Sequence, residues 1–201
     1  MTRASYHHGN LHEALLQAAR ELLADSGVED LSLRKLARAA GVSATAPYSH
    51  FRDKQSLLAE LATEGFDELA DSMESHAASA GGDTRQRLMG LAQGYVAFAT
   101  SNPALFQLMF GPAVSGLLEF SALVASGTRA YQLMEHTVRA HLEAAGRAAE
   151  TPVVAAAAWS MVHGLSTLLK DGRLEAGRQG LPDQAALVTA LCGLLEPMGS
   201  P

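Results

Sequence analysis

Small hydroxyl-bearing side chains and basic side chains gather between Ser32 and Lys54, where they could contact a nucleic acid. Residues 43–49 are mostly small or polar, and Tyr48 and His50 add hydrogen-bonding groups. Such side chains can enter a major groove or bind phosphates. Five basic side chains and one acidic one give this segment a net charge of +4, so the rest of the chain carries −10. The overall charge of −6 argues against a polyanionic partner, whereas its distribution permits one here.

Two short helices joined by a tight turn are expected to position these side chains. Ser32 can cap the first helix, which stops at Gly41, and a second short helix is predicted over 43–51. If Ala44 or Thr45 caps that second helix, Pro47 falls in its first turn, where a missing N–H costs little. This is the spacing of a helix-turn-helix unit, although a helical hairpin within a larger bundle would show the same spacing.

Helical periodicity continues through the rest of the 201 residues, and no segment shows convincing strand alternation. We therefore predict an all-α fold of about nine helices, with a long helix capped by Asp53 and a last one capped by Asp183. The helix expected over 117–145 contains Gly127, which could mark a kink. We expect an N-terminal helix-turn-helix domain over 1–56 and a C-terminal helical domain over 57–201.

The run LSLRKLARAAGVSATAPYSHFRDKQSLLAEL, preceded by LLQAARELLADSG, resembles the DNA-binding domain of TetR-family transcriptional regulators. The family pattern is AxxAGVS, then YxHF, then KxxLL, and the match covers about residues 10–62. The positions in register are Ala37, Ala40, Gly41, Val42, Ser43, Tyr48, His50, Phe51, Lys54 and Leu57. The resemblance implies a partner in double-stranded operator DNA.

Carried over by position, the resemblance places Tyr48, His50 and Lys54 against phosphates and Phe51 in the core. The whole set expected to bind DNA is Ser32, Arg34, Ser43, Ala44, Thr45, Ala46, Tyr48, Ser49, His50 and Lys54. The sequence departs from the family at Ala46, often Thr, and at Pro47, often Leu. Because the second helix carries no Arg, Asn or Gln, we expect specificity to depend on Arg34, on thymine methyl contacts and on DNA shape.

Aromatic and methionine side chains concentrate in the C-terminal two thirds, where they could line an apolar cavity for a small molecule. The candidate ligand-binding residues are Tyr95, Phe98, Phe106, Met109, Phe110, Tyr131, Met134, Trp159 and His163. The alternative is that these residues are simply core. The segment AWSMVHGLSTLLKDGRL also resembles the WHG-type C-terminal domain of TetR-family members, as does YVAFATSNPALFQLMFGP. His163 could contact a ligand or be a hydrogen-bonded core residue.

Helices near 152–170 and 183–195 are expected to form a homodimer contact, by analogy with the family. Residues 152–169 carry no formal charge, which suits a helix buried against its own domain and a second subunit. A membrane span would have a similar length, but interruptions such as Ser160, His163 and Thr167 favour a helix buried on all sides in protein.

Other classes of function find less support in the sequence. His7, His8 and His12 include an i, i+4 pair, but no carboxylate or cysteine completes a metal site, and no nucleophile elbow, P-loop or Rossmann pattern occurs. We expect no cofactor, no metal and no enzyme activity. The lone Cys192 and the absence of a secretory pattern favour a cytoplasmic protein. An all-helical ligand carrier that does not bind DNA is the alternative to a ligand-responsive repressor.

Overall fold

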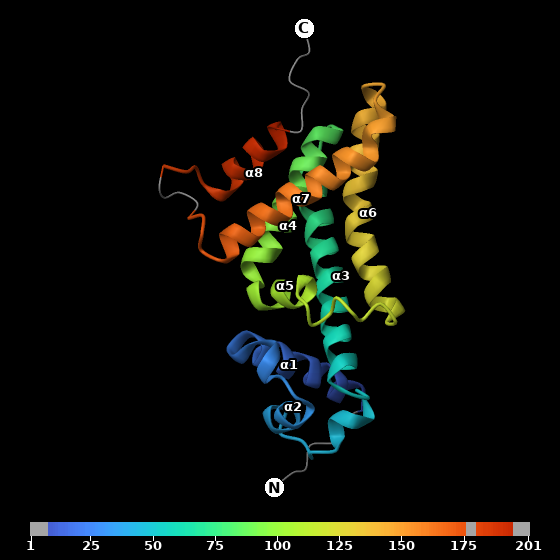
Figure 1. Cartoon of the computed structure of the whole chain (residues 1–201), viewed down its shortest axis with the longest axis vertical. Coiled ribbons are helices and arrows are strands. Elements are labelled where there is room, and N and C mark those ends of the chain that lie inside the picture. Colours follow the sequence, from blue (N-terminus) through green and yellow to red (C-terminus); the bar gives the residue numbers. More distant parts are fainter. Residues whose placement is uncertain (1–7, 176–179, 195–201) are drawn as a thin grey trace. The chain divides into compact units, whose positions relative to one another are not determined.

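The computed structural model describes residues 8–175 and 180–194, and every regular element within them is helical (Figure 1). The all-α class is confirmed. Eight α-helices and two 3-10 helices take the place of the nine helices expected. They are α1 (His8–Asp30), α2 (Leu33–Ala39), η1 (Ala46–Ser49), α3 (Lys54–Ala80), α4 (Thr84–Ser101), α5 (Pro103–Phe110), α6 (Ser121–Ala144), η2 (Ala148–Glu150), α7 (Thr151–Lys170) and α8 (Gln184–Gly193).

Packing divides the chain into two compact units. The first comprises Met1–Gly65 and Pro103–Ala125, and the second comprises Phe66–Asn102 and Ser126–Pro201. The long helix α3 begins in the first unit and ends in the second. Thus α5 and the segment after it pack with the N-terminal helices, although they lie far from them in the sequence.

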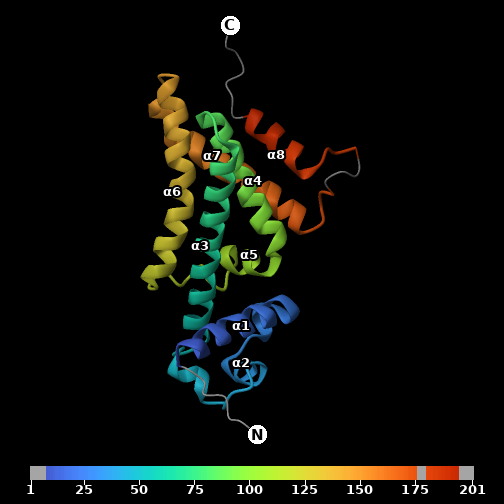
Figure 2. The same ribbon diagram turned by 180° about the vertical axis from the view of Figure 1, so that it is seen from behind.

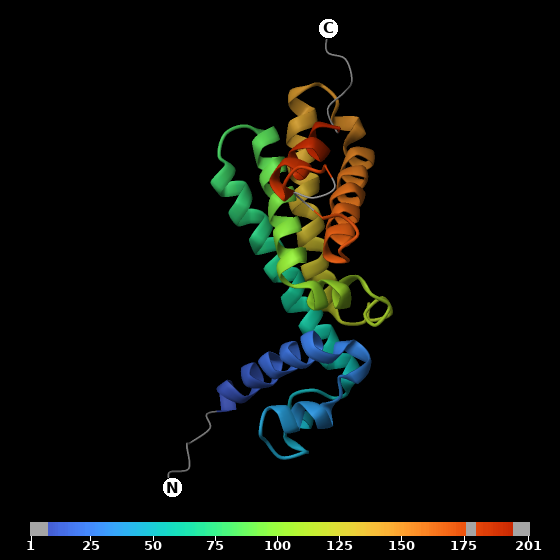
Figure 3. The same cartoon turned by 90° about the vertical axis from the view of Figure 1, so that its left-hand side faces the viewer.

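The first unit is built on an apolar face of α1. Leu15, Ala19 and Leu23 are buried there, and α1 packs against α2 and α5 (Figure 3). Gly27 has a φ of 72° and interrupts the helical geometry of α1, and a further turn then reaches Asp30. Phe51 is 1% exposed and anchors the segment after η1 in this core, as the resemblance implies.

The second unit packs α4 against α7 and α8 (Figure 2). Two glycines of α4 let it approach α3 closely. A Cβ built on Gly90 would lie 2.6 Å from the Cα of Ala77, and one on Gly94 would lie 2.7 Å from the Cα of Met73. The two backbones therefore meet directly in this seam between α3 and α4, with no layer of side chains between them.

Helix starts follow the predicted capping residues. The side chain of Ser32 accepts a hydrogen bond from the Lys35 amide, and Asp53 accepts one from the Ser56 amide at 2.8 Å. Asp183 likewise caps α8, through the Ala186 amide at 2.9 Å. These three predictions are confirmed.

Three predictions about helices need correction. The segment 43–51 forms only the four-residue 3-10 helix η1, because Pro47 and the short length leave few i to i−4 donors. The long helix α6 begins at Ser121 rather than Leu117, since turns occupy the residues after Gly111. No interruption of α6 is seen at Gly127.

One stretch of helix, Ala148–Lys170, is long and apolar enough to cross a membrane by length and composition. Core helices of globular proteins pass the same test. Within one chain, 28% of its apolar window is buried, so the expectation of a helix buried on all sides is not met by a single chain. Residues exposed along one side of α7 are Val153, Ala156, Ala157, Ser160 and Leu168.

Candidate nucleic-acid interface and ligand cavity

Helix α2 separates a buried face from a basic exposed face. Leu33, Leu36 and Ala37 are buried, whereas Arg34 and Arg38 are exposed. The chain leaves α2 at Gly41, whose φ of 67° belongs to the left-handed region, and the Val42 amide then donates to the Ala37 carbonyl at 3.0 Å. This is the geometry of a glycine C-cap, and it turns the chain tightly toward η1.

The turn and η1 present small polar side chains to solvent. Ser43, Ala44, Thr45 and Ser49 are exposed, and Tyr48 is 54% exposed. The hydroxyls of Ser43 and Thr45 lie 3.2 Å apart, and Ser49 donates to the Ala46 carbonyl at 2.7 Å. Pro47 is buried in the first turn of η1, so the ring anchors the segment while its neighbours face outward.

His50 belongs to a small cluster of rings within the first unit. Its ring lies 5.4 Å from that of His12, which stacks on Phe51 at the same separation. His12 is in turn hydrogen-bonded to the Glu60 carboxylate through Nε2. This contact gives His12 a structural partner. The other two histidines considered as metal ligands, His7 and His8, lie outside the residues whose side chains are described. No group of three potential ligands is close enough to hold a metal ion within the described ranges.

Lys54 contacts the end of α1. Its Nζ donates to the Val28 carbonyl at 2.7 Å and lies 3.4 Å from the Glu29 carbonyl. The C-terminal carbonyls of a helix attract cations, so this lysine joins α3 to α1. Two other basic residues of the segment, absent from the predicted set, are paired with acids: Lys35 with Asp30 at 2.9 Å and Arg52 with Asp53 at 2.9 Å.

All ten residues expected to bind DNA lie in the first unit, on α2, the turn, η1 and the start of α3. The structure brings the small side chains of 43–49 together on one exposed segment, next in the chain to the basic face of α2. Ser32 is engaged as the cap of α2, and Lys54 is engaged with α1. Sequence reasoning did not find these structural roles of Lys54, because the partners are backbone carbonyls.

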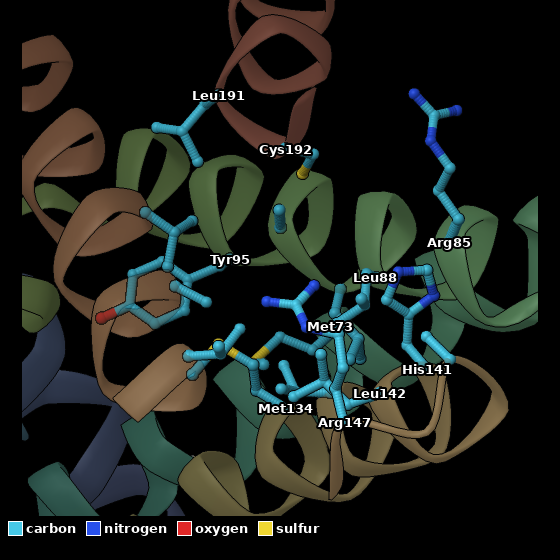
Figure 4. Close-up of a pocket in the computed structure, with 17 residues that line it drawn as sticks. Met73, Arg85, Leu88, Tyr95, Met134, His141, Leu142, Arg147, Leu191 and Cys192 are labelled. Carbon is cyan, nitrogen blue, oxygen red and sulfur yellow. The ribbon is translucent and has the colours of Figure 1, made fainter. Parts of the chain in front are cut away.

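A cavity of about 440 Å³ lies inside the second unit (Figure 4). Its walls come from α3, α4, α6, α7 and α8, together with the turn after α6. Apolar side chains supply most of the lining: Met73, Leu88, Leu91, Ala92, Met134, Val138, Leu142, Ala145, Val154, Ala158, Val162 and Leu191. The remaining lining residues are Arg85, Tyr95, His141, Arg147 and Cys192. A concave, mainly apolar site with a few polar groups is typical of small-molecule binding.

Two of the nine candidate ligand-binding residues, Tyr95 and Met134, line this cavity. Phe98 is buried elsewhere in the second unit. Phe106, Met109 and Phe110 lie on α5 in the first unit, where Met109 packs on Gly65. Aromatic and methionine content marks apolar core as readily as a cavity, so composition alone did not separate the two.

The remaining three candidates, Tyr131, Trp159 and His163, form a cluster with Tyr95. The Trp159 ring lies 5.2 Å from that of Tyr95 and 5.5 Å from that of Tyr131, both in edge-on contact. The Tyr95 hydroxyl and Nδ1 of His163 are hydrogen-bonded at 2.9 Å. Burial lowers the pKa of the half-buried His163 and raises that of Tyr95, so both groups are held neutral.

The polar lining residues Arg85, His141 and Arg147 were missed by sequence reasoning. His141 occupies the last turn of α6, and Arg147 follows the turn at Gly146, whose φ is 70°. A basic residue near a helix C-terminus is common because it complements the helix dipole, so neither residue has a sequence signal that points to a cavity. Their role as cavity lining depends on the packing of α6 against the other helices.

Two family models match the chain. Residues 15–61 match that of bacterial regulatory proteins, tetR family, and residues 88–195 match that of the tetracyclin repressor-like C-terminal domain. The second match covers more than half of the chain.

Curated relatives match part of the chain. An HTH-type transcriptional regulator of Bacillus subtilis, YobS, is 31% identical over 99 residues, which are 49% of this chain and 51% of the relative. The class A tetracycline repressor of Escherichia coli is 40% identical over 86 residues, 40% of this chain and 36% of that protein. The chain thus spans about half the length, or less, of these relatives.

Solved structures match nearly the whole chain. A protein of unknown function from Rhodococcus sp. RHA1 is 35% identical with a TM-score of 0.78, covering 96% of this chain and 97% of that one. FadR of Bacillus subtilis, solved in complex with stearoyl-CoA, is 16% identical with a TM-score of 0.72, covering 92% and 97%. The second likeness concerns the fold alone.

Proposed function

The chain belongs to the TetR family of bacterial regulatory proteins, and from this premise we propose that it is a ligand-responsive transcriptional repressor. The observation that carries the proposal is the exposed segment 43–49 beside the basic face of α2, within the region that matches the family's N-terminal model. The family is one of regulators rather than enzymes. We also propose a cytoplasmic location, because operator DNA would be reached there.

The proposed DNA-binding surface comprises the ten residues named above, from Ser32 to Lys54. Exposed hydroxyls at Ser43, Thr45 and Tyr48 supply hydrogen bonds, and Arg34 supplies charge. Because η1 is a 3-10 helix of only four residues, the element that would enter the major groove is short. Few residues can therefore contact base edges directly. Much of the affinity then comes from phosphate contacts, which weaken as salt concentration rises.

A homodimer is proposed through α7 and α8. The exposed side of α7 is apolar or small, with Val153 74% exposed, and Leu194 after α8 is 76% exposed. An apolar face of this kind on a single chain suits an interface with a second copy. A dimer would present two DNA-binding segments to two half-sites of an operator.

We assign the C-terminal domain to the WHG type on the local arrangement of the motif. Trp159 and His163 both contact Tyr95 of α4, as expected for two residues four apart on one helix face. Gly172 has a φ of 65° and turns the chain after α7. In this proposal residues 1–56 read DNA and residues 57–201 bind ligand and partner.

The cavity in the second unit is the proposed ligand site. A ligand regulates DNA binding only if it binds two conformations of the protein with different affinity. Stearoyl-CoA is bound by FadR of Bacillus subtilis, but at 16% identity that likeness does not identify the ligand of this chain. The residues that line the cavity indicate the chemical class of the ligand more directly.

Selection of bound fragments from a random double-stranded DNA library tests the proposed function. We expect enrichment of a two-fold symmetric site, bound with an affinity that falls as salt rises. The matched control is a variant in which Ser43, Thr45 and Tyr48 are replaced together by alanine, which leaves the buried core untouched. Failure to enrich any sequence would overturn the repressor assignment and favour the ligand carrier.

A further inference from the structure

The side chains that line the cavity in the second unit include positive groups and no acidic group among those that the structure describes. From this lining we infer that the ligand is a compact amphipathic carboxylic acid, with its carboxylate on Arg147 and its apolar body against α4, α6 and α7. The inference rests on the proposed function only for the regulatory role of this ligand. Binding itself is a separate property of the cavity.

Arg147 directs its guanidinium into the cavity. Figure 4 shows this group among the lining side chains, whereas the guanidinium of Arg85 points away from them. The turn at Gly146 sets this direction, and the Arg147 amide donates to the Leu142 carbonyl at 2.8 Å. The backbone that carries Arg147 is thereby fixed to the end of α6.

Glu150 orients the guanidinium and leaves part of it available. Nε and Nη2 of Arg147 donate to the two carboxylate oxygens of Glu150, each at 2.7 Å. The two N–H groups of Nη1 and the second one of Nη2 remain for another acceptor. Arginine binds carboxylates through pairs of parallel N–H donors, so a ligand carboxylate can use this remaining edge.

His141 supplies a second polar group in the lining. Its Nδ1 is hydrogen-bonded to the Thr84 hydroxyl at 3.0 Å, which fixes the ring and leaves Nε2 for a ligand. His141 and Arg147 thus both line the cavity from the C-terminal end of α6. A cationic head group would instead meet the guanidinium of Arg147 itself, because Glu150, the acid paired with it, is not among the lining residues.

The apolar lining residues indicate the character and size of the ligand's apolar body. Leu88, Leu91, Met134, Val138 and Val162 cover the walls, and methionine adapts readily to ligand shape. The volume of about 440 Å³ lies in the lower half of the usual range for ligand pockets. A medium-chain or branched acid fits this description better than a long acyl chain.

Isothermal titration of the full-length protein with decanoate, decanol and decyltrimethylammonium tests the inference near neutral pH. These probes share an apolar chain and differ in the charge of the head group. We expect decanoate to bind at least about tenfold more tightly than decanol, the equivalent of one charge-assisted hydrogen-bonded pair, and the cation to bind most weakly. Equal affinity of the wild-type protein for decanoate and decanol, or no binding of either, would by itself overturn the inference.

Three variants assign the preference to Arg147. Arg147→Gln is expected to bind decanoate and decanol equally, and Arg147→Lys to retain part of the preference because it keeps the charge. Arg139→Gln is the matched control, since Arg139 is an exposed arginine of α6 that pairs with Glu135 and does not line the cavity. Retention of the full preference in Arg147→Gln would refute Arg147 as the anchor. DNA selection is scored separately, so loss of acid binding and loss of DNA binding are distinguishable results.

Discussion

Nζ of Lys54 donates a hydrogen bond to the Val28 carbonyl at 2.7 Å and thereby ties the first residue of α3 to the end of α1. The resemblance to TetR-family domains implies that the same ammonium binds a phosphate. An ammonium has several N–H donors, so one lysine can hold α1 and still approach DNA. In a variant that lacks the ammonium, loss of the bond to Val28 would lower stability, whereas loss of the phosphate contact would lower affinity for DNA.

Lys54→Met is expected to lower both stability and affinity for DNA. Loss of the bond to Val28 should reduce the free energy of unfolding by about 1 kcal/mol, measured by urea denaturation without DNA. Arg34→Gln is the control, because Arg34 is exposed on α2 and should affect DNA affinity but not stability. If Lys54→Met weakens DNA binding with unchanged stability, the contact with α1 is not structural.

Tyr48→Phe is expected to weaken DNA binding with no effect on stability. Its side chain is 54% exposed, so the hydroxyl is available to a phosphate and its removal leaves no buried group unsatisfied. We expect a loss of about 1 kcal/mol of binding free energy, roughly fivefold in Kd, for one hydrogen bond. Fluorescence anisotropy on a selected DNA site measures this loss, and an unchanged Kd would contradict the phosphate assignment.

Gly94→Ala should destabilise the second unit. The added Cβ would lie 2.7 Å from the Cα of Met73, which is backbone and cannot move aside, so we expect a loss of about 1–3 kcal/mol. Gly127→Ala on α6 is the matched control, because its Cβ would lie 3.8 Å from the Phe66 ring, an ordinary contact distance. That variant should gain about 0.5–1 kcal/mol from helix propensity. Urea denaturation of both proteins compares the two helical glycines directly.

His163 should make stability depend on pH. Burial lowers its pKa in the folded state, so the unfolded chain takes up a proton more readily. Its contribution is complete above the unfolded pKa of about 6.5 and is lost as pH falls from there toward the folded pKa. The difference in Tm between the wild type and His163→Asn should therefore shrink from pH 7.5 to about pH 5. A constant difference would show that His163 does not titrate on unfolding.

Ala157→Glu is expected to dissociate the proposed dimer. Ala157 is exposed on α7 of a single chain, and two buried carboxylates related by a two-fold axis would repel one another. Ala140→Glu, at an exposed position of α6, controls for the added charge. Sedimentation velocity should give a dimer for the wild type and for Ala140→Glu, and a monomer for Ala157→Glu. A dimeric Ala157→Glu variant would place the interface elsewhere.

The sequence was sufficient to predict the helical class and most helix starts, because both depend on local patterns. Periodic apolar residues predict amphipathic helices, and the caps at Ser32, Asp53 and Asp183 need only neighbouring amides. The length of η1 was overestimated, since Pro47 suits both a short 3-10 turn and the first turn of a longer helix. A local sequence pattern cannot fix the length of a helix when a 3-10 turn and an α-helix accept the same residue in their first turn.

The cavity was harder to predict, because its lining depends on packing between distant helices. Tyr95 and Met134 are in the lining, but Phe106 and Met109 lie on α5, which packs with the first unit. Periodicity marks each of these residues as buried without indicating what buries it. Arg147 has the sequence signal of a residue after a helix end, and only its orientation assigns it to the cavity.

The seam at Gly90 and Gly94 constrains how the second unit can move. Where two backbones touch, no side chains are available to change rotamer, so α3 and α4 cannot slide past one another along this stretch. These two helices form the rigid side of the cavity. Any movement of the cavity walls on ligand binding would therefore involve α6, α7 and α8, and the last two carry the surface that we propose for the second subunit. Because α7 and α8 line the cavity and also carry the proposed dimer surface, a ligand that moves these helices would also change the spacing of the two subunits.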